Sequence, residues 1–257
     1  MKRRPFALSN WKMSMTVTES LAFVRDFQNL GKNLLSQIDV VICPAYTSLW
    51  PVAQALEGTD LQLGAQNIAP TADLARTGEI SATLLADVGC RWVMLGHWEI
   101  RRHLGDNDTT VNRKVHLVLE AGLTPILLIG EGRNDDSPSQ EAIEKHLAAV
   151  LDGCQAEQAA KMVFVYEPEG AIGVSTPAAQ EWVAVGCSFI RNWLHEKYGV
   201  LVSNQVRIIY GGSVTPEHAA NLLTHPDIDG LGATRRGRNP ATFIKIVEQV
   251  VKAKSRN

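Results

Sequence analysis

Residues 162–173 read MVFVYEPEGAIG, and this stretch carries the pattern on which the fold prediction rests. Its first five residues are apolar without a break, which is typical of a strand buried on both faces of a parallel sheet. Glu167 ends the run, and Pro168 and a glycine-bearing loop follow it. Because buried carboxylates are rare unless they are paired or functional, Glu167 is a candidate for chemistry at the end of this strand.

Seven more apolar runs of this kind occur along the chain, at residues 5–10, 39–44, 61–66, 91–96, 124–130, 206–212 and 228–233. The segments between them have helical patterns, such as residues 16–30, which begin with a capping-box pattern from Thr16 to Glu19. Three further helices are expected to begin with a polar N-cap followed by proline, at Thr176-Pro177, Thr215-Pro216 and Asn239-Pro240.

Eight β–α units in 257 residues predict an α/β fold, a (β/α)8 TIM barrel that forms a single domain over residues 1–257. A doubly wound open sheet is the alternative that the same alternation allows. No linker or low-complexity segment interrupts the alternation. In a barrel, functional residues lie at the carboxyl ends of the strands and in the loops that follow them.

The composition argues against several classes of function. The net charge is −2, so no broad basic face is expected and nucleic acid is not an expected partner. No apolar run is long enough to cross a bilayer, and the basic N-terminus lacks the apolar stretch of a signal peptide. The four cysteines contain no CxxC pair, which favours buried thiols in a reducing compartment, at Cys43, Cys90, Cys154 and Cys187. We therefore expect a cytoplasmic protein without a membrane partner.

Polar residues follow five of the predicted strands. They are Asn10 and Lys12, His97 and Glu99, Glu167, GGS at 211–213, and GATRRGR at 232–238. Each has an ordinary structural explanation when taken singly, such as a solvated lysine, a hydrogen-bonded histidine or a turn into a helix. Their common position at strand ends of one predicted barrel is what points to a site.

These side chains favour proton transfer next to a carbonyl group. A carboxylate can remove a proton from the carbon beside the carbonyl, and a neutral imidazole can donate to the carbonyl oxygen. A lysine ammonium stabilises the charge that develops on that oxygen. Glycine-rich turns at a helix start present backbone N–H groups to a phosphate. The pattern predicts an isomerase for a small phosphorylated carbonyl compound, with no metal and no cofactor.

Six motifs occur in order along nearly the whole chain: SNWKM (9–13), GAQN (64–67), TGEIS (77–81), LGHWEIRRHLGDND (95–108), YEP…AIG (166–173) and YGGSV (210–214). Together they closely resemble the motifs of the triosephosphate isomerase family. The resemblance implies an aldose–ketose isomerase that interconverts glyceraldehyde 3-phosphate and dihydroxyacetone phosphate through an enediolate. It also implies a homodimer, in which the loop from Gln66 to Ser81 inserts Thr77 into the partner subunit.

The resemblance also implies roles for the polar residues. Asn10 and Lys12 resemble the substrate-binding asparagine and lysine, and Lys12 is also counted as catalytic. His97 resembles a neutral histidine electrophile and Glu167 a glutamate base. Glu99 resembles the buried glutamate that pairs with the catalytic lysine, and it too is counted as catalytic.

The phosphate contacts are implied in the same way. Gly173 resembles the glycine whose N–H meets phosphate in the lid, the loop at residues 168–177 that follows Glu167. Gly212 and Ser213 would add contacts from the loop after the seventh strand. After the eighth strand the family places two glycines against phosphate, whereas this chain has Thr234 and Arg235. An arginine takes more space than glycine but can bind phosphate bidentately through its side chain.

Several positions depart from the family pattern. Trp98 replaces a small serine, and Leu128 replaces a cysteine. Ile100 replaces an arginine that would reach a glutamate resembling Glu79 in the other subunit. In the lid, which is shorter than usual, Glu169-Gly170 replaces Val-Trp.

These departures lead to two structural hypotheses. Gly170 removes a tryptophan from the lid while Trp98 adds one beside the histidine, so the two positions are hypothesised to fill neighbouring space. Glu169 is expected to be exposed in an open lid. A more specific alternative is that Glu169 pairs with Arg235, Arg236 or Arg238 when the lid closes.

Other functions remain open at this stage. The arginine after the eighth strand is similar to that of isomerases of this fold that act on tetrulose (erythrulose) phosphates, which makes such a substrate the alternative. The altered lid also allows a non-catalytic barrel that binds a phosphorylated metabolite. A lyase or aldolase is less well supported, because Lys12 is better explained as a cation beside the substrate than as a Schiff-base lysine.

Overall fold

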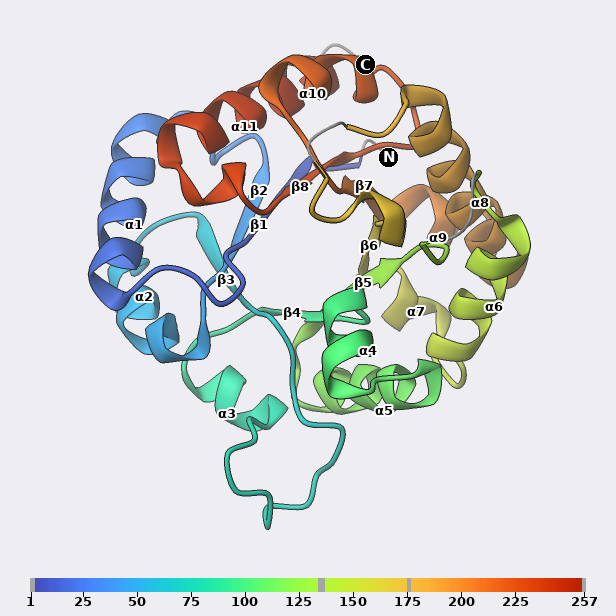
Figure 1. Ribbon diagram of the computed structural model, residues 1–257, viewed down its shortest axis with the longest axis horizontal. Helices are drawn as coiled ribbons and strands as arrows, with labels where there is room; N and C mark the ends of the chain where they lie inside the picture. The colour runs from blue at the N-terminus through green and yellow to red at the C-terminus, as the bar shows by residue number, and fades with distance from the viewer. Residues whose placement is uncertain (1–2, 134–136, 175–176, 256–257) are drawn as a thin grey trace.

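The computed structural model describes residues 3–133, 137–174 and 177–255, which form a closed barrel of eight parallel strands (Figure 1). The strands are β1 (Phe6–Asn10), β2 (Asp39–Cys43), β3 (Leu61–Ala65), β4 (Trp92–Leu95), β5 (Thr124–Ile129), β6 (Val163–Tyr166), β7 (Arg207–Gly211) and β8 (Gly230–Ala233). All eight expected strands are present, within two residues of the predicted ends. Because β1 also pairs with β8, the prediction of a barrel is confirmed and the open-sheet alternative is wrong.

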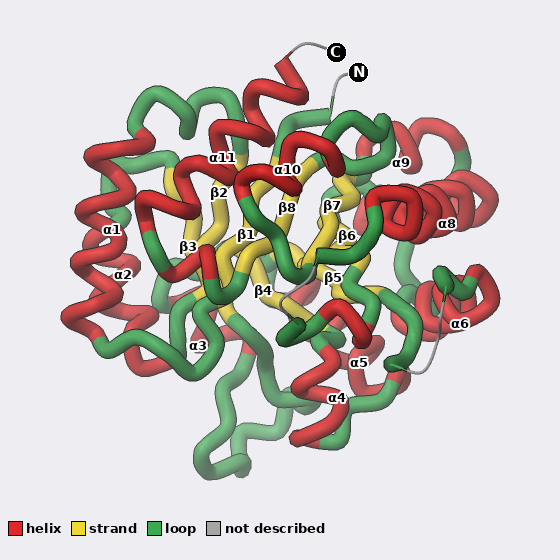
Figure 2. The backbone as a smooth tube through the Cα atoms, turned by 45° about the horizontal axis from the view of Figure 1, so that its top comes forward, coloured by secondary structure: helices red, strands yellow, loops and turns green. Residues whose placement is uncertain are grey.

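Helices surround the barrel, as seen in Figures 1 and 2. They are α1 (Val17–Gly31), α2 (Leu49–Ala55), α3 (Ala82–Asp87), α4 (Trp98–Leu104), α5 (Asp108–Glu120), α6 (Gln140–Val150), α7 (Ala156–Ala159), α8 (Gln180–Tyr198), α9 (Val200–Gln205), α10 (Pro216–Leu222) and α11 (Pro240–Ser255). Short 3-10 turns lie at Tyr46–Ser48 (η1), Glu169–Ala171 (η2) and Arg236–Arg238 (η3). None of the helices in these described ranges is both long and apolar enough to cross a membrane.

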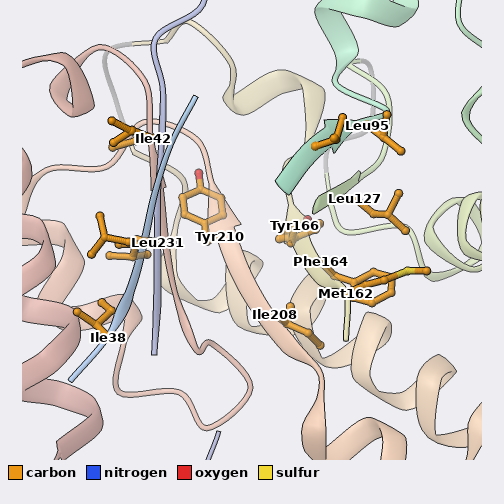
Figure 3. Packing of buried hydrophobic residues seen from close by; sticks show 14 of the residues in the cluster. Ile38, Ile42, Leu95, Leu127, Met162, Phe164, Tyr166, Ile208, Tyr210 and Leu231 are labelled. Atoms are coloured by element: carbon orange, nitrogen blue, oxygen red, sulfur yellow. The ribbon is translucent and has the colours of Figure 1, made fainter. Parts of the chain in front are cut away.

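The strands are apolar on both faces because they separate two layers of core. One set of alternate residues fills the barrel interior, including Phe6, Met94 and Val165. The intervening residues pack outward against the helices, and Figure 3 shows part of this outer layer around Phe164 and Tyr210. A strand with period-two side chains and a core on each side needs no polar face, which explains the continuous apolar runs.

Most of the expected helix starts are observed. Thr16 and Glu19 form a capping box at the start of α1, and Thr215 caps α10 with Pro216 as its first residue. The Asn239 side chain accepts a hydrogen bond from the Thr242 backbone at the start of α11. The helix start predicted at Thr176-Pro177 is wrong, because α8 begins at Gln180 with Ala179 as its N-cap. Thr176 itself lies outside the described residues.

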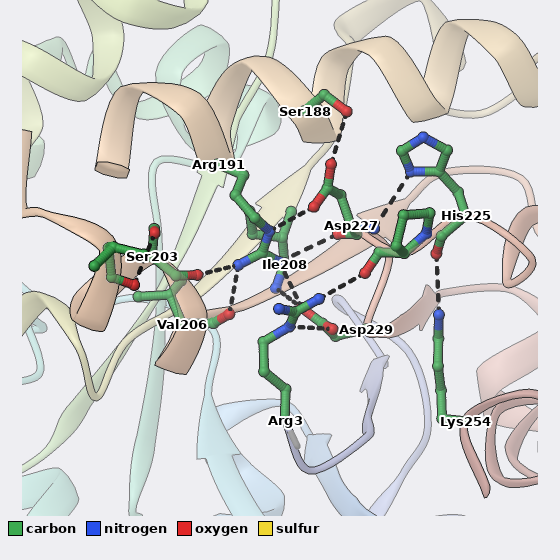
Figure 4. A network of polar contacts seen from close by, with 12 residues as sticks. Arg3, Ser188, Arg191, Ser203, Val206, Ile208, His225, Asp227, Asp229 and Lys254 are labelled. Carbon is green, nitrogen blue, oxygen red and sulfur yellow. Dashed lines mark hydrogen bonds and ion pairs between the residues drawn. The ribbon is translucent and has the colours of Figure 1, made fainter. Parts of the chain in front are cut away.

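A buried polar network fixes the amino-terminal ends of β7 and β8 (Figure 4). Arg191 of α8 pairs with Asp229 at 2.8 Å and donates to the Val206 carbonyl at 3.0 Å. Asp229 also accepts from Arg3 at 2.6 Å and from the Ile208 backbone at 2.9 Å. Each charge therefore has several partners, as burial requires. This end of the barrel holds structural polar groups, so the opposite end is free for a site.

The loop from Gln66 to Ser81 extends away from the barrel (Figures 1 and 2). Leu74 on this loop is 90% exposed. All four cysteines are free and buried, as expected.

Candidate active site

The polar residues predicted from strand ends lie together at the carboxyl end of the barrel. A cavity of about 240 Å³ is lined by Lys12, Glu167, Gly173, Gly212, Ser213, Thr234 and Arg235. Asn10 lines a small adjoining space with Glu167, and His97 and Glu99 contact Glu167 and Lys12 respectively. A larger depression of about 620 Å³, which involves α2 and the starts of β2 and β3, contains none of the predicted site residues.

The Glu167 carboxylate is buried at the end of β6. Its backbone N–H donates to the Ile129 carbonyl at 2.8 Å, which extends the pairing of β5 with β6. Gly130 allows this approach, because a Cβ atom there would lie 2.3 Å from the Glu167 carbonyl oxygen. Glu167 is only 7% exposed, and its Oε2 atom has no hydrogen-bond partner among the described residues. Burial raises the pKa of Glu167, and the positive charge of Lys12 offsets part of that effect.

His97 caps the amino terminus of α4 and faces Glu167. Its Nδ1 atom accepts a hydrogen bond from the Glu99 backbone N–H at 3.0 Å. An acceptor nitrogen carries no proton, so the neutral ring has its proton on Nε2. Nε2 lies 3.5 Å from Oε2 of Glu167. The imidazole therefore presents a donor to whatever occupies the space beside the carboxylate.

Lys12 reaches the site from a strained turn after β1. Its φ of 52° is in the left-handed region, and the Asn10 side chain accepts from its backbone N–H at 2.9 Å. Gln66 donates to the Lys12 carbonyl at 2.8 Å, which further fixes the turn. A strained backbone with this many restraints is typical of functional sites.

Glu99 holds the Lys12 ammonium, with an Nζ–Oε1 distance of 2.5 Å. Burial raises the pKa of Glu99, but the hydrogen bond and charge of Lys12, together with His97 and His103, bring it below the ordinary value. The expected pairing with Lys12 is present. The expectation that Glu99 is buried is wrong, since its side chain is 42% exposed.

The other end of the cavity is rich in donors. Gly173 has a φ of 76°, a conformation suited to glycine, and Gly212 has no room for a side chain beside the Tyr210 hydroxyl. The Ser213 hydroxyl donates to the Val174 carbonyl, which joins the lid to the loop after β7. Three arginines of the loop after β8 add positive charge, at Arg235, Arg236 and Arg238. Such a set of backbone and guanidinium donors suits a phosphate group.

A family model for triosephosphate isomerase matches residues 5–250. The chain belongs to the triosephosphate isomerase family. It is 40% identical to the triosephosphate isomerase of Carboxydothermus hydrogenoformans over 89% of this chain and 91% of that protein. It is 38% identical to the triosephosphate isomerase of Syntrophotalea carbinolica over 96% of this chain and 98% of that protein. It is also 38% identical to the triosephosphate isomerase of Symbiobacterium thermophilum, over 99% of this chain and 100% of that protein.

The Glu169 side chain is buried in this triosephosphate isomerase family member, not exposed to solvent as expected. It is 7% exposed, so the prediction of a solvated carboxylate is wrong. It pairs with Arg102 of α4 and accepts from the Arg133 backbone at 2.9 Å. Its own N–H donates to the Glu131 carbonyl at 3.0 Å, which directs the lid toward β5 and α4. Pairing with the β8 arginines, which was predicted for the closed lid, stays a prediction.

The space beside Gly170 is lined by Trp182, whereas the hypothesis placed Trp98 there. A cavity of about 270 Å³ there is lined by Gly170, Glu131 and Trp182 of α8, and Trp98 is absent from its described lining. The Glu131 carboxylate accepts from the Tyr166 hydroxyl at 2.7 Å and from the Trp182 indole at 2.8 Å. Sequence analysis missed this trio, although Glu131 directly follows a predicted strand and the strand-end rule applies to it.

Glu167→Gln is expected to slow proton transfer strongly and to raise the free energy of unfolding at pH 7. The raised pKa of Glu167 means that its charged form is disfavoured in the folded protein, so the carboxylate destabilises the fold wherever the unfolded chain is ionised. The stabilisation by Gln should therefore disappear as pH falls below 4.5, the ordinary pKa of the group. Denaturant unfolding at several pH values measures this difference.

Glu99→Gln is the matched comparison, because the pKa of Glu99 is lowered. Its charged form is favoured in the folded protein, so this variant should lose stability at pH 7 and approach the wild type at low pH. A decrease in unfolding free energy for Glu167→Gln at pH 7 would show that the Glu167 carboxylate stabilises the fold, contrary to the effect of its burial.

Proposed function

We propose that this chain interconverts glyceraldehyde 3-phosphate and dihydroxyacetone phosphate. The observation that carries the proposal is the 3.5 Å approach of the Glu167 carboxylate to Nε2 of His97 above a cavity with cationic side chains. The proposal is supported by family membership and by the name triosephosphate isomerase of each relative reported above. Glu167, His97 and Lys12 act as catalytic residues in this reaction.

The reaction moves one proton between two adjacent carbons and a second proton between the oxygens that those carbons carry. Glu167 removes the proton from the carbon next to the carbonyl, and its burial makes it a stronger base than an exposed glutamate. The N–H of His97 donates to the carbonyl oxygen as the enediolate forms. The ammonium of Lys12, held by Glu99, stabilises the negative charge on the same side. Glu167 then returns the proton to the neighbouring carbon. Nε2 of His97 gives its proton to the former carbonyl oxygen and takes one from the hydroxyl oxygen, which completes the exchange of aldose and ketose.

The purified protein should isomerise both triose phosphates and should incorporate solvent deuterium into dihydroxyacetone phosphate. Glu167→Gln should decrease kcat by about 10³-fold, which is the scale of a lost general base. His97→Gln should decrease it strongly too, while Trp50→Phe on the exposed face of α2 should leave it unchanged. Coupled-enzyme rates and NMR of the exchanged carbon measure these effects.

Two outcomes would contradict the proposal. Exchange that persists in Glu167→Gln would remove Glu167 from the role of base. A strong preference of the wild type for a four-carbon ketose phosphate would change the substrate while keeping the reaction class.

Arg235 is proposed to contact the substrate phosphate together with Gly173, Gly212, Ser213 and Thr234. It lies at the exposed edge of the cavity, at the start of η3, next to Thr234. At this position a side-chain guanidinium takes over from the backbone contacts that glycines would provide.

Arg235→Met should raise KM about tenfold with kcat changed less than about twofold, because a charge-assisted hydrogen bond to the non-reacting phosphate contributes to ground and transition states alike. Arg113→Met on the exposed face of α5 is the matched control, since Arg113 has no ion pair among the described residues. Steady-state kinetics with inorganic phosphate as competitor measure the change. An unchanged KM would assign the phosphate to other donors.

A homodimer through the loop from Gln66 to Ser81 is proposed as the working form. The loop extends from the barrel, Leu74 on it is 90% exposed, and Met13 on the neighbouring turn after β1 is 97% exposed. Sedimentation should give twice the 28.1 kDa mass of one chain. Thr77→Arg, which adds a charge at the tip, should give a monomer with decreased activity, and a monomeric wild type would contradict the proposal.

The cytoplasm is proposed as the location of the enzyme. All four thiols are free and buried, which suits a reducing compartment, and family membership points to central sugar-phosphate metabolism. Cell fractionation that finds the protein outside the cytoplasm would contradict this assignment.

A further inference from the structure

The helix that follows the histidine also contacts the segment that carries the glutamate. This segment, the lid root, comprises Glu167 to Glu169. The Trp98 indole N–H donates to the Glu167 carbonyl at 3.2 Å. The Arg102 guanidinium pairs with the Glu169 carboxylate. Both contacts come from α4, whose N-cap is His97.

The distance between Trp98 and Arg102 along α4 is similar to the distance between Glu167 and Glu169 along the lid root. Trp98 and Arg102 are four residues apart on a helix, so they lie on one face and are separated along the axis by about 6 Å. Glu167 and Glu169 are two residues apart in an extended segment, which corresponds to about 6.6 Å. One face of α4 therefore contacts two alternate residues of the lid root, Glu167 and Glu169.

The Trp98 side chain has an environment that fixes its direction. The guanidinium of Arg101 lies 5.6 Å from the centre of the Trp98 ring, and the His146 ring makes an edge contact at 5.8 Å. Arg101 is itself held by Asp108 at 2.8 Å and by the Gly96 carbonyl at 3.0 Å. The indole N–H is thus aimed at the Glu167 carbonyl before any substrate binds.

The Glu169 contact is costly to break. A carboxylate that is 7% exposed loses most of its hydration, so it needs partners of opposite charge or backbone donors. Its partners are Arg102 on α4 and the Arg133 backbone N–H after β5. If the lid root moved away from α4, Arg102 would no longer compensate this buried charge.

We propose that Trp98 and Arg102 are positioning residues that fix the lid root to α4, so that the Glu167 base and the His97 donor are held by the same helix. His97 takes its orientation from the first turn of α4, through the Glu99 N–H. Trp98, one residue along from His97, binds the Glu167 carbonyl, while the Glu167 N–H pairs with the Ile129 carbonyl. The expected effect on kcat rests on the proposed isomerase function, whereas the expected effect on hydrogen exchange of the lid root does not.

The kinetic test uses Trp98→Phe, which keeps an aromatic ring and removes the N–H, and Arg102→Met, which removes the charge. Each should decrease kcat about tenfold with KM changed less than about twofold, because a small misplacement of the base affects the chemical step more than substrate binding. Arg102→Lys should recover most of the activity. Trp50→Phe and Arg113→Met are the controls for loss of an indole N–H and of an arginine elsewhere.

The structural test follows hydrogen exchange of the Glu167 and Glu169 amides, which donate to the Ile129 and Glu131 carbonyls. Exchange over residues 163–173 should be faster in Trp98→Phe, in Arg102→Met and in Glu169→Gln than in the wild type and the two controls. Glu169→Gln keeps the size of the side chain, so it serves as a second variant if Arg102→Met folds poorly.

The two tests separate failure of this inference from failure of the proposed function. A wild type without isomerase activity, with faster exchange in the variants, would retain the positioning role and overturn the isomerase assignment. An active wild type in which Trp98→Phe and Arg102→Met keep kcat within about twofold, or in which exchange is unchanged, would overturn the positioning role.

Discussion

Closure of the sheet between β1 and β8 is the constraint on which the site depends. Phe6 pairs with Gly230, and a Cβ atom at position 230 would lie 1.7 Å from the Phe6 carbonyl oxygen. Glycine at this point therefore lets the two strands approach and complete the barrel. Closure brings the turn that carries Lys12 beside the loop that carries Arg235, although the two are separated by most of the chain. An open sheet would leave these groups at opposite edges.

The two glutamates of the site, Glu167 and Glu99, lie in different electrostatic environments. Glu167 is buried, and its Oε2 atom has no hydrogen-bond partner in the described part of the chain, so it is a stronger base than an exposed glutamate. Glu99, at the more exposed edge, is stabilised as a charge by Lys12. The two carboxylates thus have opposite pKa shifts, because burial outweighs the charge of Lys12 at Glu167, whereas the direct hydrogen bond and charge of Lys12 outweigh burial at Glu99. A buried base in this state reduces stability, which is a common feature of active sites.

Much of the fold and of the site could be predicted because both follow from local patterns. Continuous apolar runs determine where the strands lie, and the residue after each run must then point into one mouth, as Glu167 and His97 do. Glu169 could not be placed in this way. Its environment depends on which helix packs against the lid root, and nothing near residue 169 in the sequence identifies Arg102 as its partner. The same holds for Trp182, which approaches Glu131 from α8.

The sequence by itself determined the eight-fold alternation, the chemical identity of the base, donor and cation, and the points along the chain where they occur. These depend on hydrophobic periodicity and side-chain type, which are local properties. Only the tertiary structure decided how far Glu167 lies from His97, which carboxylate is deprived of water, and that α4 contacts the lid root through Trp98 and Arg102. Burial and electrostatics are sums over neighbours distant in the chain, so they exist only once the barrel has closed.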